Sequence, residues 1–534
     1  MQSPAHEPVT PDQPNRTATR NSRLKLAAAS LLLAASTWFA LREIKNYAAD
    51  AGGIRWLPRP LAWLVNPPLL ELRPPAPTPR PITEIVPSLP VRLSAGSAAA
   101  FKPGDAPAWR HPAILPTQSR PRPGPKTAAG RNPANIPATT DWQTFRLAEA
   151  IRWRKPLDAG GNATPIVLSG TIFLTGVDQA ESLKLTAYSA KSGERRWQTA
   201  IASGRFPSRH GKTSDAASTP CCDGRRIYVA WVNDYTAWLA AFSLAGERVW
   251  KTKLGPFAAT HGFASSPALS HGLVLLNVDN GQRGFMVAVR ADSGEIVWRR
   301  KRPASGDGSY SSPIVIEQSN PVDPAQPAAP ATIVSGLEAI EYRRLADGEL
   351  LWQAGGIASV SAITPLIADG ICVAGSGFPE RVLLALKLDE FDEPEISETA
   401  GRVVTTGPTP KLLWRETKSS EVPYVPSPVA HEGRLYLVHD DGLAHCRDLV
   451  TGKVLWKRRV GGNFTASPIL IGNTMLCASE TGACSLLTLE DGEILQQFNL
   501  PHGCFATPRL LAHSLLFRTT DELLCVGLPL AATE

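Results

Sequence analysis

The sequence has 534 residues, of which 43% are hydrophobic and 19% are charged, so it is long enough to bury a large core. Its net charge of +7 is unevenly placed, because residues 1–140 hold 17 Lys and Arg against 7 Asp and Glu, which leaves 38 against 41 for residues 141–534. The basic surplus therefore lies outside the predicted folded part, and that part shows no basic footprint of a nucleic-acid-binding domain.

The N-terminal region predicts a basic disordered tail at residues 1–22 and a membrane segment at residues 23–41. An apolar and small stretch from Leu26 to Leu41 follows several basic residues. This length suits an uncleaved signal anchor or the apolar core of a signal peptide that is cut after Ser36, and a buried soluble helix is a third interpretation. We favour the anchor because the basic region before it is long and no sharp cleavage site ends the stretch. The folded part is then periplasmic on a single-pass membrane protein, or secreted if the segment is cleaved.

Residues 42–140 are predicted to form an extended linker. The stretch 57–140 holds 20 of the 48 prolines of the chain, interleaved with Arg, Ala and Thr. Such a composition cannot pack a core and is typical of a semi-rigid spacer. A proline-rich ligand for a partner, or contact with anionic lipid headgroups, are the other interpretations of this segment.

The rest of the chain is organised by a recurring phrase, best seen at Ala288–Trp298. Each copy alternates apolar residues, turns at a glycine and ends on a large aromatic residue, which predicts a β-hairpin. The other copies are Ala187–Trp197, Gly246–Trp250, Gly348–Trp352, Gly452–Trp456 and a degenerate Gly492–Gln496. A hairpin of this kind cannot bury its apolar face alone, so we expect the copies to pack on one another.

A second sequence motif alternates with this hairpin phrase along the chain. It is the dipeptide Ser/Thr-Pro, which opens an apolar strand eight times. Proline lacks a backbone donor and is tolerated at the first residue of a strand. The prolines are Pro165, Pro220, Pro267, Pro313, Pro365, Pro428, Pro468 and Pro508, and before them in turn come Trp153, Trp197, Trp250, Trp298, Trp352, Trp414, Trp456 and Gln496. The pattern predicts an all-β domain at residues 141–534, an eight-bladed β-propeller of four-stranded antiparallel blades. The repeated tryptophans are expected to dock between neighbouring blades.

The two ends of this domain predict that the ring closes on itself. The chain ends without a last aromatic strand, whereas the strand around Trp153 has no blade before it, so this N-terminal strand is expected to complete the last blade. Two insertions, Glu317–Ala331 in the fourth blade and Asp389–Pro410 in the fifth, are expected to be solvated loops.

These repeats resemble the pyrroloquinoline-quinone (PQQ) repeat family of eight-bladed propellers over residues 141–534. That family includes quinone-dependent alcohol dehydrogenases, the propeller lipoprotein of the bacterial outer-membrane β-barrel assembly machinery, and envelope-anchored propellers of unassigned function. The phrases Leu254–Phe257, His261–Pro267 and Val422–Pro428 look like the last group.

The resemblance raises PQQ with Ca²⁺ as an alternative cofactor, which the residues do not favour. The adjacent pair Cys221-Cys222 invites comparison with the disulfide of the dehydrogenases, but it follows Pro220 on a predicted blade strand, where a buried thiol is ordinary. No calcium-binding set and no haem-attachment motif could be matched. We therefore expect no cofactor and no metal site. Cys477 and Cys484 flank a hairpin tip and could be bridged, although free core thiols are favoured.

No catalytic motif stands out, so the candidate ligand-binding residues are those expected at the channel mouth, where strand ends converge. They are Asn233, Asp234, His261, Asp279, Asn280, Tyr310, Glu380, Tyr424, His439, Asp440 and Arg518. For each of them the favoured interpretation is an ordinary solvated loop residue. The favoured hypothesis is a monomeric, non-catalytic binding or scaffold propeller with a protein or cell-envelope partner. The alternatives are a PQQ-dependent oxidoreductase and a propeller that binds a polysaccharide or small ligand in its channel.

Overall fold

The computed structural model describes residues 142–529, apart from 260, 282–283, 303–307, 317–328, 393–395, 400–401, 406–408 and 512. The predicted tail, membrane segment and linker at residues 1–22, 23–41 and 42–140 lie outside the described residues, as does most of the insertion at 317–331. None of the helices in the described part of the chain is long and apolar enough to cross a membrane.

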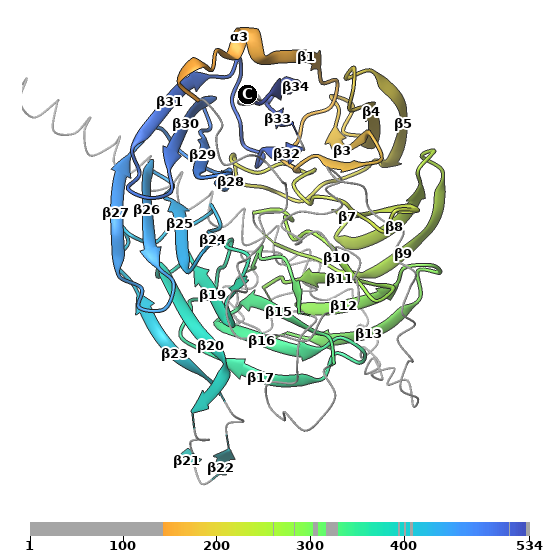
Figure 1. The fold of residues 1–534 in the computed structure, drawn as a ribbon. Coiled ribbons are helices and arrows are strands. Elements are labelled where there is room, and N and C mark those ends of the chain that lie inside the picture. The colour runs from red at the N-terminus through yellow and green to blue at the C-terminus, as the bar shows by residue number, and fades with distance from the viewer. Residues whose placement is uncertain are drawn as a thin grey trace, which may run out of the picture. The chain divides into compact units, whose positions relative to one another are not determined.

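Eight four-stranded antiparallel sheets are arranged in a ring, which confirms the predicted propeller (Figure 1). A short 3-10 turn, η1 (Trp142–Thr144), and one helical turn, α3 (Leu147–Ala150), precede the first strand. Each blade is given from its inner to its outer strand, and the first three are blade 1, with β2 (Ile166–Leu168), β3 (Thr171–Val177), β4 (Leu183–Ser189) and β5 (Arg195–Ala202); blade 2, with β6 (Cys221–Cys222), β7 (Arg226–Asn233), β8 (Thr236–Ser243) and β9 (Arg248–Pro256); and blade 3, with β10 (Ala268–Ser270), β11 (Leu273–Val278), β12 (Phe285–Arg290) and β13 (Ile296–Lys301).

The next three are blade 4, with β14 (Ile314–Ile316), β15 (Ala331–Gly336), β16 (Ala339–Arg344) and β17 (Leu350–Ala354); blade 5, with β18 (Leu366–Ala368), β19 (Ile371–Ser376), β20 (Val382–Asp392) and β23 (Thr409–Glu416); and blade 6, with β24 (Val429–His431), β25 (Arg434–Val438), β26 (Leu443–Asp448) and β27 (Val454–Arg459). The last two are blade 7, with β28 (Ile469–Ile471), β29 (Thr474–Ala478), β30 (Ala483–Thr488) and β31 (Ile494–Asn499), and blade 8, with β32 (Arg509–Leu511), β33 (Ser514–Arg518), β34 (Glu522–Gly527) and β1 (Ile151–Pro156).

The N-terminal strand closes the ring as predicted. β1 is the outer strand of blade 8 and pairs antiparallel with β34, with Ile151 opposite Val526 and Pro156 opposite Glu522. The first and last strands of the propeller therefore belong to one sheet, and β34 is not left as an open edge.

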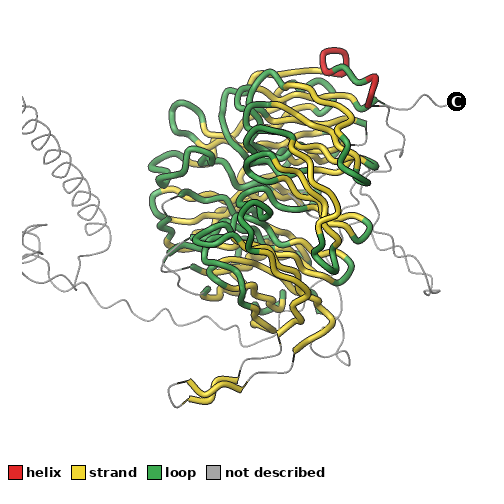
Figure 2. Tube along the Cα trace, turned by 90° about the vertical axis from the view of Figure 1, so that its left-hand side faces the viewer, coloured by secondary structure: helices red, strands yellow, loops and turns green. Residues whose placement is uncertain are grey.

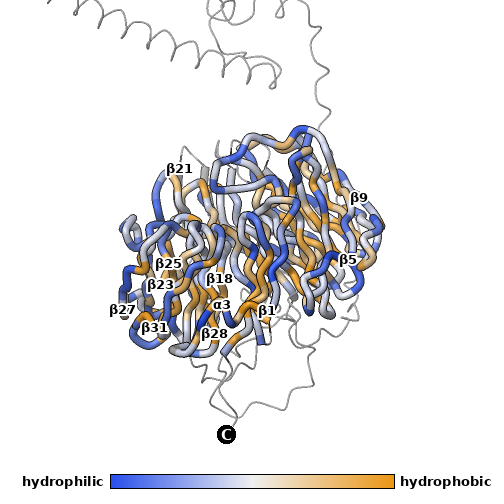
Figure 3. Tube along the Cα trace, turned by 90° about the horizontal axis from the view of Figure 1, so that it is seen from above, coloured by the Kyte–Doolittle hydropathy of each residue, from blue (hydrophilic) through white to orange (hydrophobic). Residues whose placement is uncertain are grey.

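The apolar core is divided among the spaces between blades. Each of the eight clusters of buried described residues joins two neighbouring blades, for example Val167 and Ile172 of blade 1 with Leu516 and Leu523 of blade 8. Figure 3 shows hydrophobic segments along the strands inside the ring and hydrophilic ones at turns and outer edges. Since every blade buries both faces of its sheet, no blade has a core of its own.

The conserved spacing of tryptophan and glycine within the repeats has a geometric cause. Six repeat tryptophans donate from Nε1 to a backbone carbonyl of the next blade at 2.8–3.1 Å, as Trp298 does to Leu345 O. The indole ring covers the turn glycine of that blade: a Cβ on Gly452, whose φ is +70°, would lie 2.6 Å from Trp414. The glycine is required both by the left-handed turn and by the ring that packs on it.

Two repeats depart from this pattern for visible reasons. Gln496 replaces the tryptophan of blade 7, and its Nε2 donates to Phe145 O at 2.9 Å, in the N-terminal segment that takes the place of a hairpin in blade 8. Trp352 faces blade 5, where β20 continues past the usual turn with a register shift between Lys387 and Phe391. Its buried Nε1 has no hydrogen-bond partner within the described part of the chain.

The Ser/Thr-Pro pairs form a second series of contacts around the axis. The hydroxyl of each Ser or Thr accepts the backbone N–H of its counterpart in the preceding blade, in seven consecutive links of 2.9–3.3 Å from Thr164 to Thr507. At the junction of blades 8 and 1, Arg509 Nε donates to Pro165 O at 3.2 Å. Sequence reasoning accounted for the proline as the first residue of a strand. The group that joins neighbouring blades, however, is the hydroxyl of the serine or threonine before it.

The ring has two different faces. The turns between second and third strands and the connections between blades lie on one face, the loop face, and the remaining hairpins lie on the other, the hairpin face. In Figure 2 the long loops gather on the left-hand side of the ring. The insertion of blade 5 differs from the predicted loop, because β20 and β23 continue outward and a small two-stranded sheet, β21 (Ile396–Thr399) with β22 (Arg402–Thr405), lies between them (Figure 1).

Candidate functional site

All eleven candidate residues lie on the loop face, which is therefore the candidate functional surface. The longest described connection on this face runs from residue 203 to residue 220, between β5 and β6, and we call it the strap. It begins against the turn of blade 2, where Asn233 Nδ2 donates to Ser203 O at 3.0 Å, and Asp234 N donates to Arg205 O at 2.8 Å.

The far part of the strap reaches blade 7. Lys212 Nζ lies 2.9 Å from Glu480 Oε1, a carboxylate that also accepts the hydroxyl of Thr465. From Lys212 onward the strap packs on the connection from blade 8 to blade 1, since Asn162 Nδ2 donates to Lys212 O and Ala163 N donates to Ala216 O, both at 2.9 Å. The strap therefore crosses the inner part of the loop face from blade 2 to blade 7. Sequence reasoning missed it, and the only signal was the length of this interval.

Several candidates are buried rather than presented at the mouth. Asn233, Asp279, Asn280, His439 and Arg518 are all less than a tenth exposed. Asn233 Oδ1 accepts Trp231 Nε1 at 3.0 Å, in a turn whose indoles, Trp231 and Trp238, stack across the strand pair. For these five residues the contacts observed are with the protein itself.

Asp279 belongs to a buried ion network between blades 3 and 4. Arg302 Nε lies 3.0 Å from Asp279 Oδ1, and Arg302 Nη1 lies 2.8 Å from Glu341 Oε2, which also pairs with Arg343. Burial favours the neutral form of Arg302, but Asp279 and Glu341 outweigh it and raise its pKa above the ordinary value. Removal of one member of this network would leave an unpaired buried charge between the two blades and should therefore be destabilising.

Arg518 is a buried arginine at the junction of blades 8 and 1. Its Nη1 donates to Ala163 O at 3.0 Å, while its Nε has no partner within the described residues. Burial lowers the pKa of Arg518 to about 10, so the guanidinium remains charged at neutral pH.

The candidates of blades 5 and 6 form a connected group. Asp440 accepts the backbone N–H groups of Tyr424 and Val425 at 2.5 and 3.2 Å and pairs with Arg381 at 3.4 Å. His439 Nδ1 lies 2.8 Å from Asp441 Oδ1, and Glu380 is exposed and pairs with Arg415. The two backbone contacts of Asp440 hold the connection before β24 in place.

The remaining candidates lie apart from that group. Asp234 and His261 are exposed, and the ring of His261 lies 6.1 Å from that of His210 in the strap. Tyr310 is half-buried and its backbone N–H donates to Ser361 O at 2.8 Å. The structure thus brings Asp440 to Tyr424, whereas His261 and Asp440, at equivalent ends of different repeats, belong to blades on different sides of the ring.

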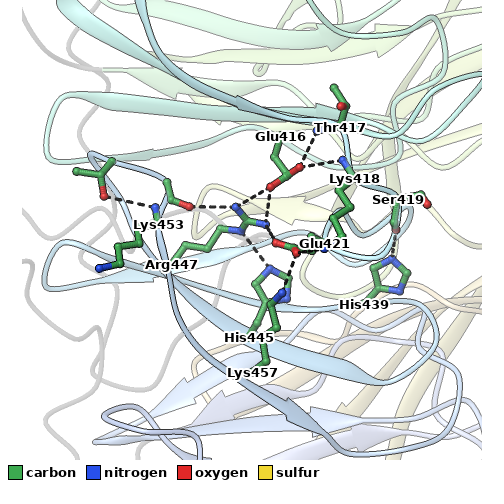
Figure 4. Close-up of polar contacts among 12 residues, drawn as sticks. Glu416, Thr417, Lys418, Ser419, Glu421, His439, His445, Arg447, Lys453 and Lys457 are labelled. Atoms are coloured by element: carbon green, nitrogen blue, oxygen red, sulfur yellow. Dashed lines mark hydrogen bonds and ion pairs between the residues drawn. The ribbon is translucent and has the colours of Figure 1, made fainter.

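Sequence reasoning also missed a charged group between blades 5 and 6 (Figure 4). Arg447 lies 3.3 Å from Glu416 and 2.8 Å from Glu421, and Glu421 also binds Lys457 at 2.7 Å. Hydrogen bonding to Lys457 lowers the pKa of Glu421 to about 2. His445 is buried beside them, and burial lowers its pKa to about 3. The signal in the sequence was a run of polar residues on an otherwise apolar strand.

The residues do not fit a quinone site. Cys221 packs in the cluster between blades 2 and 3 and Cys222 in the cluster between blades 1 and 2, so their thiols point to opposite sides of β6. All eight cysteines are free and buried, and burial raises the pKa of Cys477 to about 12. No group of three or more His, Cys, Asp or Glu side chains among the described residues is placed to hold a metal ion.

The ring of four-stranded sheets, the interblade tryptophans and the Ser/Thr-Pro links define a PQQ-like eight-bladed propeller. Comparison with known proteins agrees, since residues 152–238 and 399–506 match the family model described as outer membrane protein assembly factor BamB. Both findings confirm the resemblance seen in the repeats.

Individual relatives are distant. The quinohemoprotein alcohol dehydrogenase ADH IIB of Pseudomonas putida is 26% identical over 163 residues, which cover 28% of this chain and 21% of that protein. Among solved structures, BamB from Moraxella catarrhalis has a TM-score of 0.48 at 14% identity, covering 71% of this chain and 99% of that one. The quinohemoprotein alcohol dehydrogenase ADHIIG from Pseudomonas putida HK5 has a TM-score of 0.48 at 15% identity, covering 72% and 76%. Neither likeness to a solved structure bears on function.

Proposed function

We propose that this chain is a non-catalytic binding or scaffold propeller that presents its loop face to a protein or cell-envelope partner. The observation that carries the proposal is the strap, whose Lys212–Glu480 contact of 2.9 Å ties blade 2 to blade 7 across the region where a propeller would admit a small ligand. The same face presents two exposed aromatic side chains, Tyr235 at 43% and Phe378 at 53%. Exposed aromatic residues of this kind are enriched in protein interfaces.

The location follows from the N-terminal sequence. Residues 23–41 are proposed to anchor the chain in the cytoplasmic membrane, and residues 42–140 to act as an extended spacer, with a monomeric propeller on the periplasmic side. The support is the apolar stretch with basic residues before it and the proline content that follows. A cleaved segment would instead release the same propeller.

A pull-down from the envelope fraction tests the proposal. The full-length protein is compared with a double variant, Tyr235→Ala with Phe378→Ala, and with a control, Val450→Ala, which removes an apolar side chain of 54% exposure from the hairpin face. We expect one partner to be recovered by the wild type and the control and to be depleted with the double variant. Equal recovery by all three proteins would show that the loop face is not the binding surface.

The alternative, a PQQ-dependent oxidoreductase, is supported by the distant dehydrogenase relative, although the residues described here do not fit the cofactor. It is tested by adding PQQ and Ca²⁺ to the purified protein and following dye reduction with simple alcohols. Turnover, or bound quinone and metal in the protein as isolated, would overturn the non-catalytic proposal. A polysaccharide or small ligand in the channel would show as a thermal shift on addition.

A further inference from the structure

The corner of the loop face at blade 2 combines exposed aromatic and cationic side chains. Tyr235, at the tip of the turn between β7 and β8, is 43% exposed, and the guanidinium of Arg205 lies over its ring at 4.8 Å. On the two strands that follow this turn, Lys251 Nζ of β9 lies 4.0 Å from the ring of the partly buried Trp238 of β8. We call these four residues the cationic corner.

The cationic corner is held in a fixed shape. Asp234 and Tyr235 both have positive φ values, +47° and +55°, at a turn where asparagine and glycine are the usual residues. The strap stabilises this turn, because Arg205 N donates to Asp234 Oδ1 and Asp234 N donates to Arg205 O, at 3.2 and 2.8 Å. The turn keeps the side chain of Tyr235 in solvent, where a partner can reach it.

The charge around the corner is positive and local. Arg205 and Arg209 of the strap and Lys251 and Lys253 of β9 are exposed. Asp234 is engaged with the backbone of Arg205, and Asp215 pairs with Arg209 at 2.9 Å. The guanidinium of Arg205 lies over the tyrosine ring, and the Arg205 side chain is exposed. An exposed guanidinium can bind a carboxylate through two parallel hydrogen bonds.

We infer that the cationic corner is the docking site of an acidic, extended segment of a protein partner, with Arg205 and Tyr235 as the anchoring side chains. The inference rests on the proposed function and names where and by what chemistry the partner binds. A stacked arginine and tyrosine supply the residue types that dominate binding energy in protein interfaces. The basic surface is confined, because the propeller as a whole is slightly acidic and exposed Glu380 and half-buried Asp440 lie elsewhere on this face. A short acidic segment therefore fits better than a long polyanion such as nucleic acid.

The binding chemistry is tested with a short fluorescent peptide of repeated Asp-Glu-Phe triplets and its counterpart with lysine in place of the acids. We expect fluorescence anisotropy to show binding of the acidic peptide only, weakened about 10-fold or more by Arg205→Glu or Tyr235→Ala and by raised salt. The control is Arg225→Glu, the same charge change at an exposed residue on the hairpin face of the same blade. Far-UV circular dichroism checks that each variant is folded.

Three outcomes would overturn the inference: no binding of the acidic peptide, an equal loss with Arg225→Glu, or binding of a single-stranded oligonucleotide that is at least as tight and equally sensitive to Arg205→Glu.

A second arm separates this inference from the proposed function. The photo-crosslinker p-benzoylphenylalanine is placed at position 235, at position 378 on the same loop face and, as a control, at position 450 of the full-length protein in cells, and the crosslinked peptides are identified by mass spectrometry. If an acidic protein segment is crosslinked from position 235 and this crosslink is lost with Arg205→Glu, the result supports both the cationic corner and the scaffold proposal. A protein crosslinked from position 378 but not from position 235 overturns the cationic corner and leaves the scaffold proposal standing. No protein crosslinked from position 235 or 378, or one crosslinked from position 450 alone, contradicts the scaffold proposal itself.

Discussion

Substitution of the turn glycine in blade 6 tests how the blades are held together. Gly452 and Gly433 lie in the same blade with nearly identical φ values, +70° and +71°, but a Cβ on Gly452 would lie 2.6 Å from Trp414, whereas a Cβ on Gly433 would have nothing within 4 Å. Gly433→Ala should therefore lower the free energy of unfolding only by the left-handed backbone penalty, roughly 1–2 kcal/mol.

Gly452→Ala adds a displaced indole to the same backbone penalty. Ordinary carbon contacts are about 3.5–4.0 Å, so Trp414 must move by about 1 Å. Overpacking of this kind costs roughly 1–3 kcal/mol, and loss of the 2.9 Å bond from Trp414 Nε1 to Leu449 O costs about 1 kcal/mol more. Gly452→Ala should therefore exceed Gly433→Ala by about 2–4 kcal/mol.

Urea unfolding of both variants measures this difference, and a double-mutant cycle identifies its source. In a Trp414→Leu background the penalty of Gly452→Ala should fall to that of Gly433→Ala, because the obstructing ring is gone. Equal penalties for the two alanine variants, or an unchanged penalty for Gly452→Ala without Trp414, would refute the role of the indole.

Three further predictions concern closure, indole bonding and pH. Deletion of residues 141–156 removes β1 and opens an edge of blade 8, so the product should aggregate or unfold on size-exclusion chromatography; a folded monomer would contradict the closure. Trp298→Phe loses a bond to Leu345 O and should cost about 1 kcal/mol more than Trp352→Phe, whose Nε1 has no partner among the described residues, in chemical denaturation; equal costs would argue against this difference. Since His445 has a pKa of about 3 when folded and an ordinary value of 6.5, the unfolded chain takes up its proton first as the pH falls, and this stability is complete above pH 6.5 and lost progressively towards pH 3. His445→Gln should remove about 3 kcal/mol of the loss between pH 7 and pH 4.5, and an unchanged pH dependence would contradict this.

The ring itself could be predicted from sequence because its causes are local. Each repeat contains its own signals for the blade, namely a glycine at the turn, a proline at the start of a strand and an aromatic residue at a fixed distance from both. The closing strand was predictable because Trp153 has no blade before it in the sequence. The bridging role of the serine and threonine hydroxyls was not predictable from the same signals, since each one acts on the neighbouring blade.

The candidate site was less predictable because its contacts are not local. Lys212 and Glu480 are separated by 268 residues, and nothing near either one indicates the other. Asp279 and Arg518 resembled residues of a channel mouth, but they are buried because charged partners and carbonyl groups of adjacent blades surround them. Only the structure explains why glutamine replaces tryptophan at position 496. The neighbour of Gln496 is the N-terminal segment rather than a hairpin.

The direction of β1 determines how mechanical tension would act on the protein. Ile151 lies opposite Val526 at the hairpin-face end of blade 8, and Pro156 lies opposite Glu522 at the other end. If the proposed anchor holds the chain before residue 142, a pull on it first loads Trp142 and Phe145, which pack between blades 7 and 8, and then enters β1 at the hairpin face. A partner bound to the loop face, as proposed, would resist that pull, and force along β1 would shear its hydrogen bonds together instead of breaking them one after another.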